Sequence, residues 1–86
     1  MINQGNEWAP PKLYRVGELV RYTGLSRQTI HNYTAMGLIS EAEWTPGGHR
    51  LYDELVFRRL KRIAELKGEL KMTEIVKLLE AEQPVN

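Results

Sequence analysis

Apolar residues recur with a helical period near the start of the chain. Val16, Leu19 and Val20 fall at i, i+3 and i+4, which places them on one face of a short helix over residues 16–22. Gly24 follows, and glycine readily adopts the left-handed conformation that ends a helix. The pattern therefore predicts a short helix with a sharp stop.

A second helix is predicted directly after this stop. Ser26 is a favourable N-cap, and Ile30, Tyr33 and Met36 then fall on the inward face before Gly37 breaks the pattern. Only a short turn separates the two helices. This spacing predicts a helix-turn-helix, a motif whose second helix commonly enters the major groove of DNA.

Two short strand candidates flank a turn in the middle of the chain. They occupy residues 38–40 and 50–52, and a Pro-Gly-Gly sequence at 46–48 supplies the turn between them. The pattern predicts a small β-hairpin that Leu51 holds against the core.

Helical periodicity returns in the last third of the chain. Asp53 is placed to cap a third helix that ends at Gly68, and a fourth helix begins near Met72 and ends before Pro84. The inward positions predicted for these two helices are Val56, Phe57, Leu60, Ile63, Ala64, Met72, Ile75, Val76 and Leu79. The predicted fold is therefore mainly α, a winged helix-turn-helix of about four helices with one small β-hairpin wing.

Length and composition limit what the chain can do. Its 86 residues make one small domain, which we place at residues 12–83, between a flexible N-terminal arm (1–11, with Trp8 as its one anchor) and a tail (84–86). No apolar run approaches the roughly 20 residues that a membrane span needs. Cysteine is absent, which fits a reducing compartment. We therefore expect a cytoplasmic protein with no membrane partner.

Charge is unevenly distributed, although the net charge is only +1. Between Lys12 and Arg62 nine cations oppose five anions, whereas from Ile63 onward three lysines oppose five glutamates. A polyanion would therefore contact the middle of the chain. A solvated surface of mixed charge would give the same counts.

The predicted second helix carries hydrogen-bonding side chains on or near its polar face. Arg27, Gln28, His31 and Asn32 are long enough to reach base edges or phosphates from a helix in a major groove. Arginine can pair with guanine there, and glutamine or asparagine with adenine. Any surface helix has a polar face, so the preceding turn is what favours DNA.

The hairpin has the position of a wing, because it follows a helix-turn-helix. Wings commonly contact phosphates. Arg50 would supply the charge, His49 is a second candidate contact, and the glycines would let the tip backbone approach DNA. Without its neighbours, the same sequence would be read as an ordinary chain reversal.

Three further residues are candidates for phosphate contacts. Arg58 and Arg59 lie on the predicted third helix, where a solvated face with Arg58 paired to Glu54 is an equally good explanation. The hydroxyl of Tyr22, at the end of the first helix, is the third candidate.

Catalytic chemistry is not predicted. Two histidines, one aspartate and no cysteine provide no metal site and no nucleophile motif, and the chain has no phosphate-binding glycine loop. We expect no enzyme activity, no catalytic residue, no metal, no cofactor and no small-molecule ligand in this chain.

The run YRVGELVRYTGLSRQTIHNYTAMGLIS, followed by GGHRLY and two helices, resembles the DNA-binding domain of the MerR family of bacterial transcription regulators. The resemblance implies a winged helix-turn-helix whose second helix (26–36) enters the major groove. The hairpin (38–52) would be the first wing, and the turn at 68–71 a second. It also implies sequence-specific binding to double-stranded DNA in transcriptional regulation, commonly by dimers on inverted repeats in promoters.

The chain also departs from the family pattern. The sequence HNYT at 31–34 stands where an Arg-Tyr-Tyr-Glu-like run is usual, and His49 replaces a common tyrosine. Arg15 and Lys71 occupy helix starts where serine or threonine is expected. Each of these starts should be weaker by about 1 kcal/mol.

Regulators of this family continue into a long helix that forms an antiparallel coiled coil, and the present sequence contains no such heptad stretch. The chain is then either a domain of a longer regulator or a naturally short one, similar to stand-alone relatives and phage-type excisionases. We expect a monomeric or weakly associating domain, with RNA polymerase or a second copy on DNA as further partners. Two alternatives are an excisionase-like factor that bends DNA and a protein-interaction module on the same fold.

Overall fold

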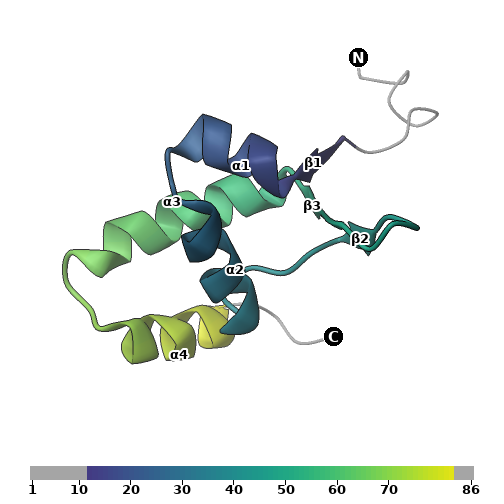
Figure 1. Ribbon diagram of the computed structural model, residues 1–86. Helices are drawn as coiled ribbons and strands as arrows, with labels where there is room; N and C mark the ends of the chain where they lie inside the picture. Colours follow the sequence, from purple (N-terminus) through teal and green to yellow (C-terminus); the bar gives the residue numbers. More distant parts are fainter. Residues whose placement is uncertain (1–11, 83–86) are drawn as a thin grey trace, which may run out of the picture.

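The structure, a computed structural model, describes residues 12–82. Four helices and a small three-stranded antiparallel sheet, which lies at one side of the domain, make up the fold (Figure 1), so the predicted mainly-α architecture is confirmed. The elements in chain order are β1 (Leu13–Arg15), α1 (Val16–Thr23), α2 (Arg27–Ala35), β2 (Glu43–Trp44), β3 (Arg50–Asp53), α3 (Leu55–Lys67) and α4 (Met72–Glu82). The predicted arm at 1–11, with Trp8, and the predicted tail at 84–86 lie outside the described residues.

The turn between α1 and α2 forms as its residue types predict. Gly24 has a φ of 77°, and its N–H donates to the Val20 carbonyl at 2.9 Å. The Ser26 hydroxyl then accepts a hydrogen bond from the N–H of Thr29 at 3.0 Å. Backbone groups at the end of α1 and at the start of α2 thus find hydrogen-bond partners within the short turn. These bonds fix the direction of α2 relative to α1.

Two glutamates support the helix starts that lack a serine or threonine cap. The N–H of Arg15 donates to Glu18 Oε1 at 2.9 Å, and the N–H of Lys71 donates to Glu74 Oε1 at 2.8 Å. These bonds are one half of a capping box, the half supplied by the third helical residue. The weakening expected for these two helix starts therefore comes only from the other bond of the capping box, which a serine or threonine side chain at residue 15 or 71 would have accepted.

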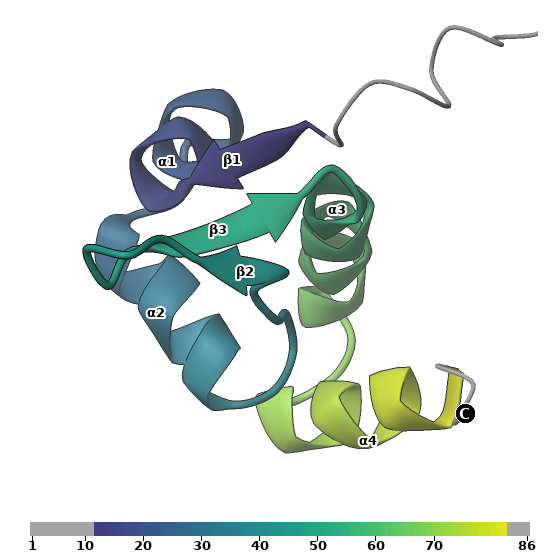
Figure 2. The same ribbon diagram turned by 90° about the vertical axis from the view of Figure 1, so that its right-hand side faces the viewer.

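The sheet has one strand more than predicted. β3 lies in the middle, with β1 antiparallel on one side and β2 antiparallel on the other (Figure 2). Tyr14 of β1 pairs with Tyr52, and Trp44 of β2 pairs with Arg50. β1 was not predicted because three residues between a Pro-Pro pair and a helix are too few to show alternation.

The strand predicted at residues 38–40 is wrong. Gly37 ends α2 with a φ of 81°, and the N–H groups of Leu38 and Ile39 both turn back to the Tyr33 carbonyl. Both side chains are buried, whereas consecutive residues of a strand face opposite sides. The hairpin therefore begins only at Glu43.

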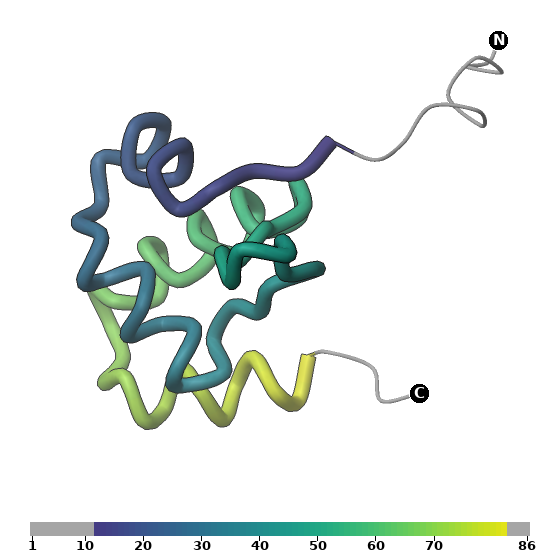
Figure 3. Tube along the Cα trace, turned by 45° about the vertical axis from the view of Figure 1, so that its right-hand side comes forward, coloured from purple at the N-terminus to yellow at the C-terminus, as the bar shows by residue number. Residues whose placement is uncertain are grey.

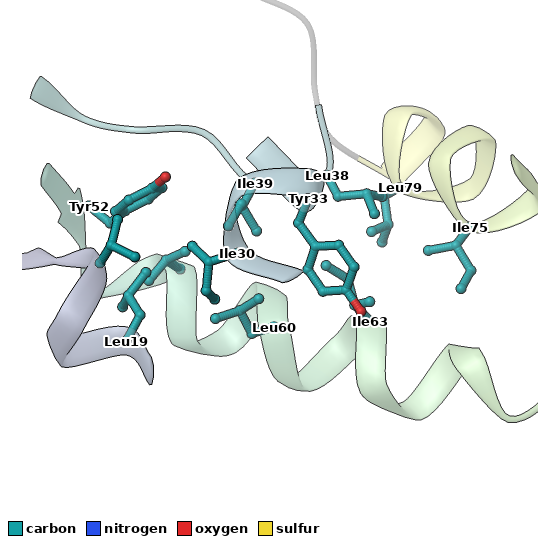
Figure 4. Packing of buried hydrophobic residues seen from close by; sticks show 12 residues of the cluster. Leu19, Ile30, Tyr33, Leu38, Ile39, Tyr52, Leu60, Ile63, Ile75 and Leu79 are labelled. Carbon is teal, nitrogen blue, oxygen red and sulfur yellow. The ribbon is translucent and has the colours of Figure 1, made fainter. Parts of the chain in front are cut away.

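A single apolar core extends along α3 (Figure 4). It runs from Leu19 of α1 and Tyr52 of β3 to Ile75 and Leu79 of α4. Tyr52 is 0% exposed, so it anchors the hairpin more deeply than the half-buried Leu51 predicted for that role.

Two other predicted core positions were also wrong, because Met36 and Ala64 are exposed. Met36 directly precedes Gly37, where the chain leaves the helix, so the inward pattern of α2 ends at Tyr33.

The arrangement leaves α1, α2 and the hairpin accessible on one side of the molecule. α4 packs against α3 at the end of the molecule that is far from α1 (Figure 3). One hydrogen bond ties the helix-turn-helix to the sheet: Thr34 Oγ1 and the hydroxyl of Tyr52 are 2.7 Å apart. The orientation of the hairpin relative to α2 therefore depends in part on this partly buried contact.

Candidate nucleic-acid interface

A groove lies between the start of α1, the inner side of α2 and the tip of the β2–β3 hairpin. We call it the wing groove, and its lining residues are Arg15, Val16, Gly17, Glu18, Arg21, Arg27, His31, Gly48, His49 and Arg50. The lining residues include four arginines, two histidines and one carboxylate, that of Glu18, which already accepts the N–H of Arg15; Glu41, outside the lining, contacts Arg50. The groove is therefore strongly cationic, in a chain whose net charge is only +1.

Four predicted contact residues come together in the wing groove. Arg27 and His31 enter it from α2, and His49 and Arg50 from the hairpin. Residues eighteen or more positions apart in sequence thus share one surface. A cation placed here can approach the same ligand as the polar face of α2.

Arg15 and Arg21 also line the wing groove, and sequence reasoning missed both as contacts. Arg15 was considered only as a poor helix cap, and Arg21 only as a charge in the overall count. In α1, Gly17 and Arg21 are one turn apart on a face that carries none of the core residues, but this position does not distinguish a groove-lining cation from a solvated one.

Gln28 and Asn32 occupy the exposed face of α2. The Nε2 of Gln28 donates to Oδ1 of Asn32 at 2.9 Å, across one helical turn. Both amides are therefore held side by side, with the Gln28 carbonyl and the Asn32 amide N–H groups left for other partners. The preceding Arg27 lies at the groove edge, close to Gly17, where an added Cβ would be 3.5 Å from its Nη2.

The hairpin tip is closed by Thr45. Its N–H donates to the His49 carbonyl at 2.8 Å, its carbonyl accepts from Gly48 at 2.9 Å, and its hydroxyl accepts from the N–H of His49 at 3.0 Å. Gly48 has a φ of 86°, a conformation in which L side chains are strained. The Pro-Gly-Gly sequence thus forms the predicted turn, with Gly48 as the glycine that the geometry requires.

Arg50 is half-buried at the base of this tip. Its Nε is 3.3 Å from Glu41 Oε2, and its guanidinium carbon is 4.6 Å from the centre of the Trp44 ring. Neither neighbour was predicted.

Arg58 and Arg59 do not line the wing groove. Both border a second depression between the α2–β2 connection, α3 and α4. Arg59 Nε donates to the Leu38 carbonyl at 2.8 Å, and Arg58 is exposed. The suggested Glu54–Arg58 ion pair does not form between these described residues.

Arg62, one turn further along α3, is held by Glu82 of α4. Its Nε and Nη2 donate to the two carboxylate oxygens, which lowers the pKa of Glu82 and raises that of Arg62. We call the side chains of Arg58, Arg59 and Arg62 the α3 arginine face.

Tyr22 is also outside the wing groove. It is 65% exposed, and its ring meets the edge of Phe57 at a centroid distance of 6.2 Å. Tyr14 contacts the same ring of Phe57 at 4.9 Å, so three aromatic rings form a cluster beside β1.

No three His, Asp or Glu side chains come together as metal ligands anywhere in residues 12–82. Over the same residues, no helix is both long and apolar enough to cross a membrane.

Comparison with known proteins shows the family to which this domain belongs. The model of the MerR HTH family regulatory proteins matches residues 14–82. The chain belongs to this family. Among curated MerR-family relatives, the mercuric resistance operon regulatory protein of Bacillus cereus is 42% identical over 69 residues, covering 77% of the chain and 51% of the relative. The nodulation protein NolA of Bradyrhizobium elkanii is 41% identical over 54 residues, covering 63% and 25%.

A solved MerR-family structure has the same fold. MtaN, the N-terminal part of a multidrug transporter activator of Bacillus subtilis, superposes with a TM-score of 0.74 at 29% identity, covering 83% of this chain and 66% of that one. The chain spans about a quarter to a half of the length of the two curated relatives. The matched residues are the winged helix-turn-helix, DNA-binding domain of the MerR family, and the relatives that share it include transcription regulators rather than enzymes.

Proposed function

We propose that this MerR-family domain places α2 in the major groove of double-stranded DNA, while the hairpin contacts a phosphate strand beside it. The observation that carries the proposal is the wing groove, in which Arg27 and His31 of α2 face Arg50 and His49 of the hairpin. A B-DNA major groove is about 12 Å wide and admits one α-helix. The cations beside that helix then meet the phosphates that border the groove.

Base reading is assigned to the exposed face of α2. Arg27 is suited to the two acceptors of guanine, and Asn32 or Gln28 to the donor and acceptor of adenine. The hydrogen bond between Gln28 and Asn32 orients both amides before DNA arrives. Less side-chain freedom is then lost on binding, which favours a defined base at this position.

Phosphate contacts are assigned to the other cations of the wing groove. Arg15 and Arg21 of the first helix region and Arg50 of the hairpin carry no sequence information themselves, but they fix the register of α2 on the duplex. Each phosphate that they neutralise releases condensed counterions. Affinity should therefore fall steeply as salt is raised.

The biological setting proposed is transcriptional regulation in the cytoplasm, with a second copy of the domain on DNA and RNA polymerase as partners. Support comes from the family, since the relatives include an operon regulator and a transporter activator. In a dimer, two domains would read half-sites of an inverted repeat, so pairing would raise an affinity that a single small domain keeps modest.

The test is a selection of bound sequences from random duplexes, followed by fluorescence anisotropy on the selected site. We expect one preferred half-site and a salt slope that Arg50→Ala flattens by about 1 while lowering affinity on all sequences alike. A loss confined to one base position would contradict the phosphate role of Arg50. A row of adjacent sites with strong bending would instead indicate an architectural factor, and no binding to any duplex at low salt would overturn the DNA proposal.

A further inference from the structure

Arg50 is held on two sides before any DNA is bound. Trp44 lies directly opposite Arg50 in the β2–β3 register, and the guanidinium stacks on its indole at 4.6 Å. Glu41, at the base of the hairpin, contacts only the Nε edge, at 3.3 Å. One face and one edge of the planar group are therefore occupied by neighbours on its own wing.

The terminal N–H groups of Arg50 are the donors that suit a phosphate. A guanidinium has five N–H donors in a rigid fork, and Glu41 uses the one on Nε. Among the described residues, neither terminal nitrogen of Arg50 has a hydrogen bond, and the side chain lines the wing groove. The contact with Glu41 is thus not the bidentate pair that would consume the fork.

The exposure of Trp44 points the same way. This side chain is 51% exposed on a two-residue strand, where it adds little to the core. The Arg50 guanidinium lies over this ring at a distance that suits a cation–π interaction, so the exposed indole has a partner on the wing itself.

We propose that Glu41 and Trp44 are positioning residues, which hold the Arg50 guanidinium with its terminal nitrogens ready for a DNA phosphate. This inference rests on the proposed function, because it assumes that the hairpin contacts a phosphate. Arginine has many rotamers in water, and freezing them on binding costs affinity. Side chains that have already restricted the guanidinium remove most of that cost.

The experiment measures affinity for the selected duplex, by anisotropy, in single and double variants. Glu41→Ala and Trp44→Ala should each weaken binding about three- to ten-fold, the range expected for one side chain left to be immobilised. Glu41→Gln and Trp44→Phe should recover most of the loss, since an amide oxygen still accepts the Nε–H and a phenyl ring still stacks. In an Arg50→Ala background, neither alanine variant should weaken binding further.

Glu43→Ala is the matched control for charge. Glu43 is an exposed carboxylate on the same hairpin, without a hydrogen bond or ion pair among the described residues. Its removal should raise affinity slightly by reducing repulsion of the phosphates. If Glu41→Ala also raises affinity, Glu41 only repels DNA and the inference is overturned.

The salt dependence of DNA binding distinguishes a failure of the positioning role from a failure of the proposed phosphate contact. Glu41→Ala and Trp44→Ala should keep the wild-type salt slope, because the phosphate contact is still made, whereas Arg50→Ala flattens it. If Arg50→Ala has no effect, the proposed wing contact itself fails. If Arg50→Ala weakens binding but the two positioning variants do not, only the positioning role is wrong. Thermal unfolding of every variant shows whether a loss comes from a damaged hairpin.

Discussion

The wing groove and the α3 arginine face both carry several arginines, but the side chains of these arginines contact different partners. In the wing groove, Arg15, Arg21 and Arg27 are exposed and lie beside the polar face of α2. On the α3 face, Arg59 holds the Leu38 carbonyl and Arg62 holds Glu82, so two of three guanidiniums connect parts of the protein to each other. A run of arginines in a sequence therefore does not identify a nucleic-acid surface, because what each guanidinium already contacts decides its role.

The largest expected effect contrasts charge reversal on the two surfaces. Arg27→Glu should weaken binding to the selected duplex at least thirty-fold, about 2 kcal/mol, because a base contact is lost and a charge facing DNA is inverted. Arg58→Glu, an exposed arginine on the α3 face, should change affinity less than three-fold. Anisotropy titrations at one salt concentration make the comparison, and equal losses would mean that the α3 face also meets DNA.

A second expected effect concerns the stability of the domain rather than its affinity for DNA. Arg59→Ala should lower the free energy of unfolding by about 1–2 kcal/mol, because the Leu38 carbonyl loses a charged donor at a partly buried site. Chemical denaturation of this variant and of Arg58→Ala, which should be nearly neutral, tests the point. The affinity of Arg59→Ala for DNA, measured well below its melting temperature, should stay within about two-fold of wild type; a large loss would revive the phosphate role first suggested for Arg59.

A smaller effect is expected at Arg21, which only the structure places in the wing groove. Arg21→Ala should weaken binding about three-fold on every sequence and reduce the salt slope by about 1, as one phosphate contact requires. Lys61→Ala removes an exposed cation of α3 that lines neither depression and serves as the control. An unchanged slope in Arg21→Ala would place that side chain off the DNA.

The smallest effect concerns the ion pair between α3 and α4. The hydrogen bond from Arg62 lowers the pKa of Glu82 in the folded state, so its contribution to stability is present above the ordinary carboxyl pKa of about 4.3 and is lost as pH falls through the lower folded value. Wild type should therefore unfold at a slightly higher temperature than Glu82→Gln at pH 7, and at the same temperature near pH 2. The difference should also shrink in high salt, since both side chains are well exposed.

The helices and the turn between the first two could be predicted because their signals are local. Gly24, Ser26 and the i, i+3, i+4 positions act within a few residues, and the structure has each of them as expected. The hairpin was predicted with the wrong first strand, because Gly37 and the two buried side chains after it are a helix end packed into the core. That choice depends on α3 and α4, which are distant in sequence.

The candidate site could be predicted only in part, for the same reason. Position on α2 or at the hairpin tip identified Arg27, His31, His49 and Arg50, which the fold brings together. Nothing local distinguishes Arg21 from Arg59, although one lines the groove and the other binds a carbonyl. The Glu41–Arg50 contact spans nine residues and a turn, and it appears only once the register of the hairpin is known.

The hydrogen bond between Thr34 and Tyr52 restricts the distance between α2 and the hairpin. It joins the last turn of α2 to the central strand, so the helix and the hairpin cannot separate without breaking a partly buried hydrogen bond. If α2 and the hairpin contact DNA as proposed, a duplex has to present its major groove and a neighbouring phosphate at a set distance to fill both contacts together. The domain would then respond to the local width of DNA as well as to its bases, and a site with the right sequence but the wrong groove dimensions would bind poorly.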